Sequence, residues 1–162
     1  MTVVSDTSPL TNLAAIGRLD LLPRLFHSVL IPDAVAKELT ACPTEVPGFV
    51  DLAANEWLVV KAVAQPSVAT ALSLDLDVGE AETIALAVEL GADVVLMDER
   101  RGRRLAERLG LRALGLLGVL VKAKREGVIE RVEPLLDALI SEAGFWIGPD
   151  LRSRVLREVS EE

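Results

Sequence analysis

Short apolar runs alternate along this chain with segments whose apolar residues have helical spacing. Runs of mostly aliphatic residues at 3–4, 29–31, 57–60 and 94–97 have the length of buried strands. Strands without polar alternation are typical of a parallel sheet covered on both faces, because the crossover connections place helices there. The pattern therefore predicts an α/β fold, specifically a three-layer α/β/α arrangement around a central parallel sheet of four or five strands.

Turn and cap residues set the expected ends of these elements. Ser8 and Pro9 open one helical segment and Gly17 follows its end, while Gly91 and Gly110 follow the ends of two others. A short fifth strand is expected at 111–114. We expect helices over residues 8–16, 33–39, 79–90, 99–109, 116–126, 132–143 and 152–159.

Composition restricts the kind of protein and the chemistry available to it. With 162 residues, 51% of them hydrophobic, the chain fits one folded domain over 1–162. The longest apolar stretch, 113–121, is too short to cross a membrane, and the start lacks the features of a secretory signal, so we expect a soluble cytoplasmic protein. One cysteine and one histidine exclude disulfide frameworks and Cys-rich or His-rich metal sites. The 25 carboxylates instead suit hard cations such as Mg²⁺ and Mn²⁺.

Two aspartates stand directly after apolar strands. Asp6 follows the run Val3-Val4-Ser5, and Asp98 follows the run at 94–97. Because the carboxyl ends of parallel strands meet at one edge of a sheet, we expect these side chains to lie close together. Carboxylates a few ångströms apart repel, and one of them must take up a proton or share a cation. Capping of the following helix is an alternative role for Asp6.

Three glutamates are further candidates. Glu80 and Glu82 open the helix at 79–90, where the helix dipole alone favours a negative charge. Positions two apart point to nearly opposite sides of a helix, so only one can face a common site, and we choose Glu80. Glu38 has no basic residue four positions before it, and it is either a surface residue or part of the same acidic group.

A basic segment follows Asp98. Between residues 100 and 125 there are nine basic residues and one acidic residue, whereas the whole chain has a net charge of −8. Such a run is either a solvated helix face or a surface that contacts phosphates beside the carboxylates. Any binding of nucleic acid must therefore be local.

Taken together, these segments resemble the PIN-domain family, the fold of VapC-type toxin ribonucleases. The strand leading into Asp6 is similar to the first acidic motif of that family, and the segment around Glu38 to the second. Residues 79–87 are similar to the third motif and residues 95–99 to the fourth. Residues 102–124 resemble a PIN-like subfamily whose members are described as nucleic-acid-binding proteins. This chain has Glu80 and Glu82 where the toxins usually have aspartate, and Glu99 where a second aspartate often follows.

The resemblance implies roles for the acidic residues. Asp6, Glu80 and Asp98 would hold Mg²⁺ or Mn²⁺ directly or through water, and Glu38 would complete the acidic pocket. One or two such ions activate a water and neutralise the charge that develops on a phosphodiester during hydrolysis. Glu99 ranks below these four.

The resemblance also implies substrate-binding residues. Ser8 would donate a hydrogen bond to a ligand or phosphate near the site. Bidentate hydrogen bonds to phosphates would come from Arg103 together with Arg100, Arg101 or Arg104. With five aromatic residues and no tyrosine, extensive base stacking is not expected, so recognition would depend on the shape and backbone of RNA.

The function expected from these features is a metal-dependent endoribonuclease. The toxin of a toxin-antitoxin pair, whose antitoxin would cover the basic groove, is one such enzyme. The alternative is a PIN-fold nucleic-acid-binding module with little or no nuclease activity. A phosphatase with Asp6 as nucleophile is disfavoured, because Ser8 stands where such a motif needs a second acid. The apolar surplus predicts a homodimer through residues 10–16 or the C-terminal helices.

Overall fold

Five parallel strands form a single sheet in the computed structural model, which describes residues 1–162. The predicted α/β class and the parallel sheet are confirmed. The strands are β1 (Val3–Ser5), β2 (Val29–Ile31), β3 (Leu58–Val60), β4 (Val94–Leu96) and β5 (Ala113–Leu114).

The chain reverses its direction of winding at the central strand, β1. The strand order is β3-β2-β1-β4-β5, so β2 and β3 are added on one side of β1 before β4 and β5 are added on the other. Strand β1 pairs with β2 through Val4 and Leu30, and with β4 through Ser5 and Leu96. In open α/β sheets, ligands bind at the carboxyl ends of the strands where such a reversal occurs. The residues that directly follow β1 and β4 border this position.

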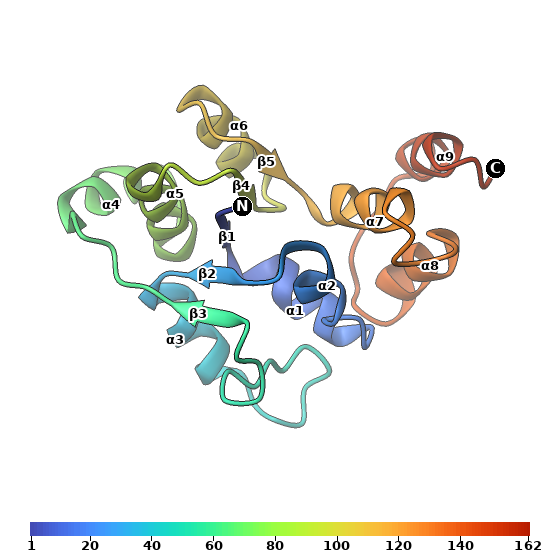
Figure 1. Ribbon diagram of the computed structural model, residues 1–162, viewed down its shortest axis with the longest axis horizontal. Helices are drawn as coiled ribbons and strands as arrows, with labels where there is room; N and C mark the ends of the chain where they lie inside the picture. The colour runs from blue at the N-terminus through green and yellow to red at the C-terminus, as the bar shows by residue number, and fades with distance from the viewer.

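Nine helices cover the sheet, and Figure 1 shows them on both of its faces. Two of them, α2 and α4, were not expected from the sequence. The short helix α2 has four buried apolar residues out of six, so it has no polar face to reveal a helical period. The helices are α1 (Thr7–Ala15), α2 (Leu21–Phe26), α3 (Asp33–Ala41), α4 (Pro66–Leu72), α5 (Val78–Leu90), α6 (Arg100–Arg108), α7 (Leu116–Arg125), α8 (Glu133–Ser141) and α9 (Pro149–Glu158).

Two apolar clusters lie on opposite faces of the sheet. Val3 belongs to the larger cluster, which includes residues of α1, α2, α3, α7, α8 and α9. The next residue, Val4, belongs to the smaller cluster, which includes residues of α5 and α6. Because successive residues of one strand enter different clusters, both faces of the sheet are buried, as the uninterrupted apolar strands predict. This arrangement has the three layers of the expected α/β/α fold.

One expectation about the surface was wrong. Leu10 and Leu13 were candidates for a dimer contact, but both are fully buried in the core of the chain. Their burial follows from the position of α1, which packs its apolar face into the larger cluster beneath β1. Large apolar side chains that remain exposed near the C-terminus include Trp146 and Leu151. No helix combines the length and apolar character that crossing a membrane requires.

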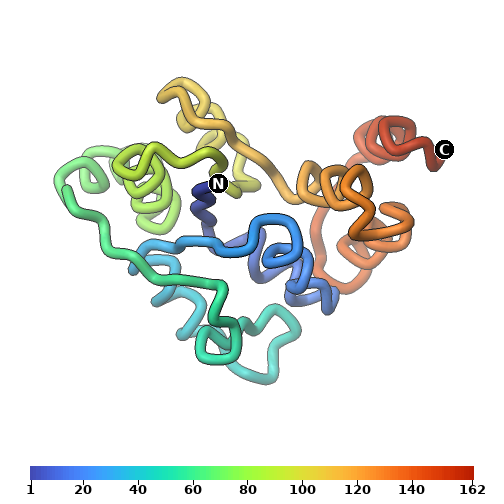
Figure 2. Tube along the Cα trace, viewed as in Figure 1, coloured from blue at the N-terminus to red at the C-terminus, as the bar shows by residue number.

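The last three helices form a group at one end of the molecule (Figures 1 and 2). The side chain of Glu161, which is 4% exposed, fixes the end of the chain against this group. Its carboxylate accepts hydrogen bonds from the backbone amides of Val132 at 2.7 Å and Glu133 at 3.0 Å, and it pairs with Lys124 at 3.2 Å. Glu161 therefore satisfies the first amides of α8 in place of a local cap.

We predict that Glu161→Ala lowers the free energy of unfolding by about 2 kcal/mol, because it removes charged acceptors from partly buried amides. Glu162→Ala is the matched control, since that glutamate forms an ion pair with Arg157 between half-exposed side chains. The control should change stability by less than about 1 kcal/mol. Urea denaturation followed by circular dichroism measures both, and equal losses would contradict this role of Glu161.

Candidate active site

A cavity of about 470 Å³, here called the acidic cavity, opens beside the carboxyl ends of β1 and β4. Six carboxylates line it, and no lysine or arginine does. They come from separate segments of the chain, and five of them follow strands or lie at the starts of helices, the exception being Glu38 within α3. The lining residues are Asp6, Thr7, Ser8, Thr11, Glu38, Asp77, Glu80, Asp98, Glu99 and Phe145.

Asp6 is a buried carboxylate with no counter-charge beside it. It directly follows β1 and is 7% exposed, and although it precedes the first turn of α1, its side chain makes no capping hydrogen bond. Burial raises the pKa of Asp6 to about 7, the amide of Thr7 opposes this in part, and repulsion from Asp77, Glu38 and Asp98 adds to it. The sequence left open that Asp6 caps α1. In the structure its side chain does not cap this helix.

Asp98 is held in a fixed orientation on the opposite side of the cavity. Its Oδ1 accepts a hydrogen bond from the backbone amide of Leu116 at 2.7 Å, and its Oδ2 accepts one from the hydroxyl of Ser8 at 3.1 Å. Burial raises the pKa of Asp98, while these two hydrogen bonds and the positive charge of Arg103 oppose the rise. The carboxylate is therefore aimed by α1 on one side and by the first turn of α7 on the other.

Ser8 acts on a carboxylate in this structure rather than on a free ligand. Its hydroxyl donates to Asp98, and it accepts a hydrogen bond from the side-chain amide of Asn12 at 3.0 Å. Asn12 lies one helical turn after Ser8 on α1, so the two side chains share a face. The contact to phosphate expected from the sequence would require Ser8 to give up this bond.

The ambiguity between Glu80 and Glu82 is resolved by the geometry of α5. Glu80 lines the acidic cavity, whereas Oε1 of Glu82 accepts a hydrogen bond at 3.2 Å from the amide of Ala34, in the first turn of α3. Glu82 therefore satisfies an amide at the start of a neighbouring helix. The two glutamates point to different sides of α5, as their spacing predicts.

Asp77 is a member of the cavity that sequence reasoning missed. Its side chain caps α5 by accepting a hydrogen bond at 2.8 Å from the amide of Glu80. The pKa of Glu80 is raised to about 8, and burial is the largest cause. A hydrogen bond to the Asp77 side chain and repulsion from Asp77, Asp6 and Glu99 raise it further. Burial and the acidic neighbour therefore favour the protonated form of the Glu80 carboxyl. The signal in the sequence was the spacing of Asp77 and Glu80, an acid three residues before a glutamate at the start of an apolar helix, which is typical of a capping box.

A glycine allows α5 to approach the other acids. A Cβ atom at Gly79 would lie 2.5 Å from Oε1 of Glu38 and 3.4 Å from Oδ1 of Asp6. The carboxylates of Glu38 on α3 and Asp6 after β1 therefore meet at the bare backbone of α5. Although Glu38 is an exposed residue overall, its carboxylate reaches the cavity.

The four arginines expected to bind substrate line more than one hollow around α6. Arg103 shares a hollow of about 250 Å³ with Arg100 and Arg104, and Arg101 does not line it. Arg103 approaches Asp98 closely enough to influence its pKa, and its guanidinium occupies the space that a side chain at position 115 would take. Arg101 instead forms an exposed ion pair with Asp75 at 3.7 Å. A second hollow of about 460 Å³ on another side of α6 is lined by Asp75, Leu76, Glu99, Arg100, Arg101, Arg104, Leu105 and Arg108. The helix therefore presents one of the four arginines beside the acidic cavity and three beside this second hollow.

The donor set of the cavity suits a hard divalent cation. Six carboxylates with no basic residue in the lining, and raised pKa values at Asp6, Glu80 and Asp98, leave an unbalanced negative charge once these groups ionise. The hydroxyl of Thr7 is buried in the same lining without a hydrogen-bond partner. No three carboxylates are already arranged around one point as metal ligands. The hydrogen bonds of Asp98 and the contact between Glu80 and Asp77 account for this, because they point oxygens at protein groups.

The fold and the site together define a parallel α/β domain with a group of carboxylates at the point where the strand order reverses. The chain belongs to the PIN-domain family, since the sequence model of the PIN domain matches residues 2–161. PIN domains are nucleic-acid-binding folds that are commonly nucleases and generally use divalent metals. No curated protein gives a significant match to the sequence.

We predict that, without divalent metal, the protein loses stability as the pH rises from about 4 to 8. In the unfolded chain Asp6 ionises near its ordinary pKa of 3.8, whereas in the folded chain its pKa is about 7. Between these values a rise in pH stabilises the unfolded state more than the folded state. At about 1.4 kcal/mol per pKa unit, the effect of Asp6 is at most about 4 kcal/mol.

Asp6→Asn should therefore stabilise the protein at pH 8 and flatten its pH profile. Urea denaturation in EDTA at several pH values measures this, with the exposed Asp75→Asn as a control that keeps the wild-type profile. A profile of Asp6→Asn that runs parallel to the wild type would show that Asp6 is not destabilised by ionisation.

Proposed function

We propose that this protein is a metal-dependent endoribonuclease that hydrolyses RNA phosphodiester bonds in the cytoplasm. The observation that carries the proposal is the acidic cavity, in which buried carboxylates from separate segments meet without a basic residue in the lining. A purely structural cluster of this kind would be unfavourable, because each buried negative charge costs free energy unless a cation compensates for it. Membership of a family of nucleic-acid-binding folds supports a phosphodiester substrate.

The chain's own residues supply distinct parts of this chemistry. Asp6, Glu80 and Asp98 would hold Mg²⁺ or Mn²⁺, which activates a water for attack and neutralises charge on the phosphate. Glu38 completes the negative surface beside Asp6, at the approach that Gly79 leaves open. Ser8, Asn12 and the amide of Leu116 keep Asp98 aimed at the cavity.

Arg103 is the residue best placed to contact the substrate. It lies beside Asp98 at the border of the acidic cavity and forms no ion pair. Its planar guanidinium can donate two parallel hydrogen bonds to one phosphate. Arg100, Arg101 and Arg104 would contact phosphates further along the strand, from the second hollow.

A second candidate function is a PIN-fold module that binds nucleic acid with little or no cleavage. One observation favours it: no three carboxylates converge as metal ligands in this structure. The two candidates differ in whether the acidic cavity binds a divalent ion with useful affinity. Under the nuclease proposal, the protein could act as the toxin of a toxin-antitoxin pair, with a cognate antitoxin that blocks the site and a homodimer formed through the C-terminal helices.

The first test measures binding of Mn²⁺ by isothermal titration calorimetry. Wild type should bind Mn²⁺, and Asp6→Asn and Asp98→Asn should each lose this binding, since neutral amides are poor ligands for hard cations. Asp75→Asn is the control at an exposed position and should bind as wild type does. Absence of binding in the wild type would favour the non-catalytic module.

The second test compares two glutamates on the same helix turn. Glu80→Gln should lower the rate of RNA cleavage in Mn²⁺ by a factor of about 100 or more, because it removes a charged group from the reacting site. Glu82→Gln is the matched control and should cleave at nearly the wild-type rate, since Glu82 bonds to α3 outside the cavity. Equal rates for the two variants would contradict the assignment of Glu80.

A further inference from the structure

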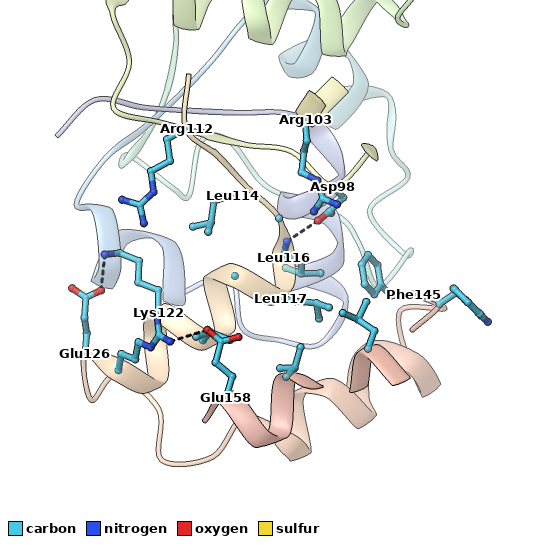
Figure 3. A pocket seen from close by; sticks show the side chains of 17 residues that line it. Asp98, Arg103, Arg112, Leu114, Leu116, Leu117, Lys122, Glu126, Phe145 and Glu158 are labelled. Carbon is cyan, nitrogen blue, oxygen red and sulfur yellow. Dashed lines mark hydrogen bonds and ion pairs between the residues drawn. The ribbon is translucent and has the colours of Figure 1, made fainter. Parts of the chain in front are cut away.

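A groove of about 600 Å³ runs from the acidic cavity between α7 and α9. Figure 3 shows Asp98, Arg103 and Phe145 near one end of it and Lys122 and Glu126 toward the other. Asp98 and Phe145 line both the groove and the acidic cavity, so the two spaces adjoin. A ligand that extends from the carboxylates along the groove would remain in contact with the protein.

Apart from Asp98, at the end shared with the acidic cavity, the charges of the groove that form no ion pair are positive. Lys122 pairs with Glu126 at 2.9 Å, and Arg125 pairs with Glu158 at 2.7 Å, so these four charges compensate one another. Arg103 and Arg112 also line the groove, and neither takes part in an ion pair. Two free guanidinium groups along a groove that starts at the acidic cavity favour a polyanionic strand as its occupant.

Trp146 is the largest exposed apolar side chain in the groove. It is 84% exposed, in the loop between α8 and α9. Both neighbours fix the backbone of this loop: the amide of Phe145 donates to the carbonyl of Leu139 at 2.9 Å, and Ile147 is buried. The loop therefore holds the indole exposed to solvent. In this position the tryptophan does not contribute to the apolar core.

The position of the indole depends on Gly148. A Cβ atom at this glycine would lie 3.3 Å from the Cη2 atom of Trp146, so the ring rests against the bare backbone at the start of α9. One side of the ring is thus supported while most of its surface faces solvent. A rigid, exposed aromatic surface of this kind suits stacking against a planar group, because little conformational freedom is lost on binding.

We propose that Trp146 stacks on an unpaired base of single-stranded RNA that passes through the groove from the acidic cavity. This inference rests on the proposed function and adds a residue that contacts a base of the substrate outside the acidic cavity. In a duplex, each base is already stacked and paired, so only an unpaired base can reach the indole. Arg103 and Arg112 hold the phosphates of the strand, and Trp146 holds a base.

The test measures RNA binding in EDTA, where no divalent ion supports cleavage. Single-stranded oligouridylate and a blunt RNA duplex with the same number of phosphates are titrated into the protein, and tryptophan fluorescence and anisotropy of labelled RNA are recorded. Trp57→Phe leaves Trp146 as the only tryptophan, and Trp146→Phe leaves Trp57.

We expect the oligouridylate, and not the duplex, to quench the fluorescence of the Trp57→Phe protein. Trp146→Ala should weaken binding of the single strand by about 10-fold or more, with partial recovery in Trp146→Phe, and leave duplex binding unchanged. Arg112→Gln should weaken binding of both RNAs and reduce the salt dependence. Because Trp146 is exposed, these variants should fold as wild type does, which circular dichroism checks.

Unchanged affinity of Trp146→Ala for the single strand, or equal quenching by the duplex, would overturn the proposal. Quenching of Trp146 by neither RNA would also overturn it and would assign the groove to another occupant, such as an apolar protein segment. These outcomes are distinct from failure of the nuclease proposal: a protein whose Trp146 is quenched by single strands, yet which never cleaves RNA in Mn²⁺, retains the stacking site and loses only the catalytic assignment.

Discussion

The reversal of winding at β1 is the constraint on which the rest of the site depends. Because β4 returns to the free side of β1, the residues that follow these two strands must share one crevice, and in this chain both strands are followed by aspartates. The crevice then gathers Glu38 from α3 and Asp77 and Glu80 from the start of α5. Burial and mutual repulsion make the ionised cavity unfavourable, and a bound divalent cation would relieve this repulsion, as the proposed function requires.

Neutral groups around the cavity determine which carboxylates are fixed and which are free. Asp98 has a hydrogen bond on each oxygen, so its orientation is set by α1 and α7. Asp6 has no capping bond and no ion pair, and burial raises the pKa of Glu80. The cavity therefore contains one carboxylate in a fixed orientation, Asp98, beside others with raised pKa values. Carboxylates with perturbed pKa values are common at functional sites.

The sequence predicted the fold class and most elements, because apolar strands and helical periodicity are local signals. It also predicted Asp6, Glu38, Glu80 and Asp98 as site residues, and all four line the acidic cavity. The positions of Asp6 and Asp98 after strands and of Glu80 at the start of a helix can be read from neighbouring residues. Asp77 was missed although its spacing to Glu80 is a local capping signal, because its place in the cavity depends on how α5 packs against the other acids. Asn12 was missed because its contact with Ser8 bears on the site only through the bond from Ser8 to Asp98. The arginines show the same limit: their charge was evident, but the direction of each side chain around α6 was not.

The bond between Asp98 and the first amide of α7 connects two regions that would otherwise be independent. Helix α7 forms one wall of the groove, so any ligand that tilts this helix alters the distance from Leu116 to the carboxylate and with it the free energy of protonating Asp98. Thermodynamic linkage makes this effect reciprocal, so neutralising Asp98 must change affinity in the groove by the same factor. Binding of such a ligand in the groove and protonation of Asp98 in the cavity would therefore influence each other.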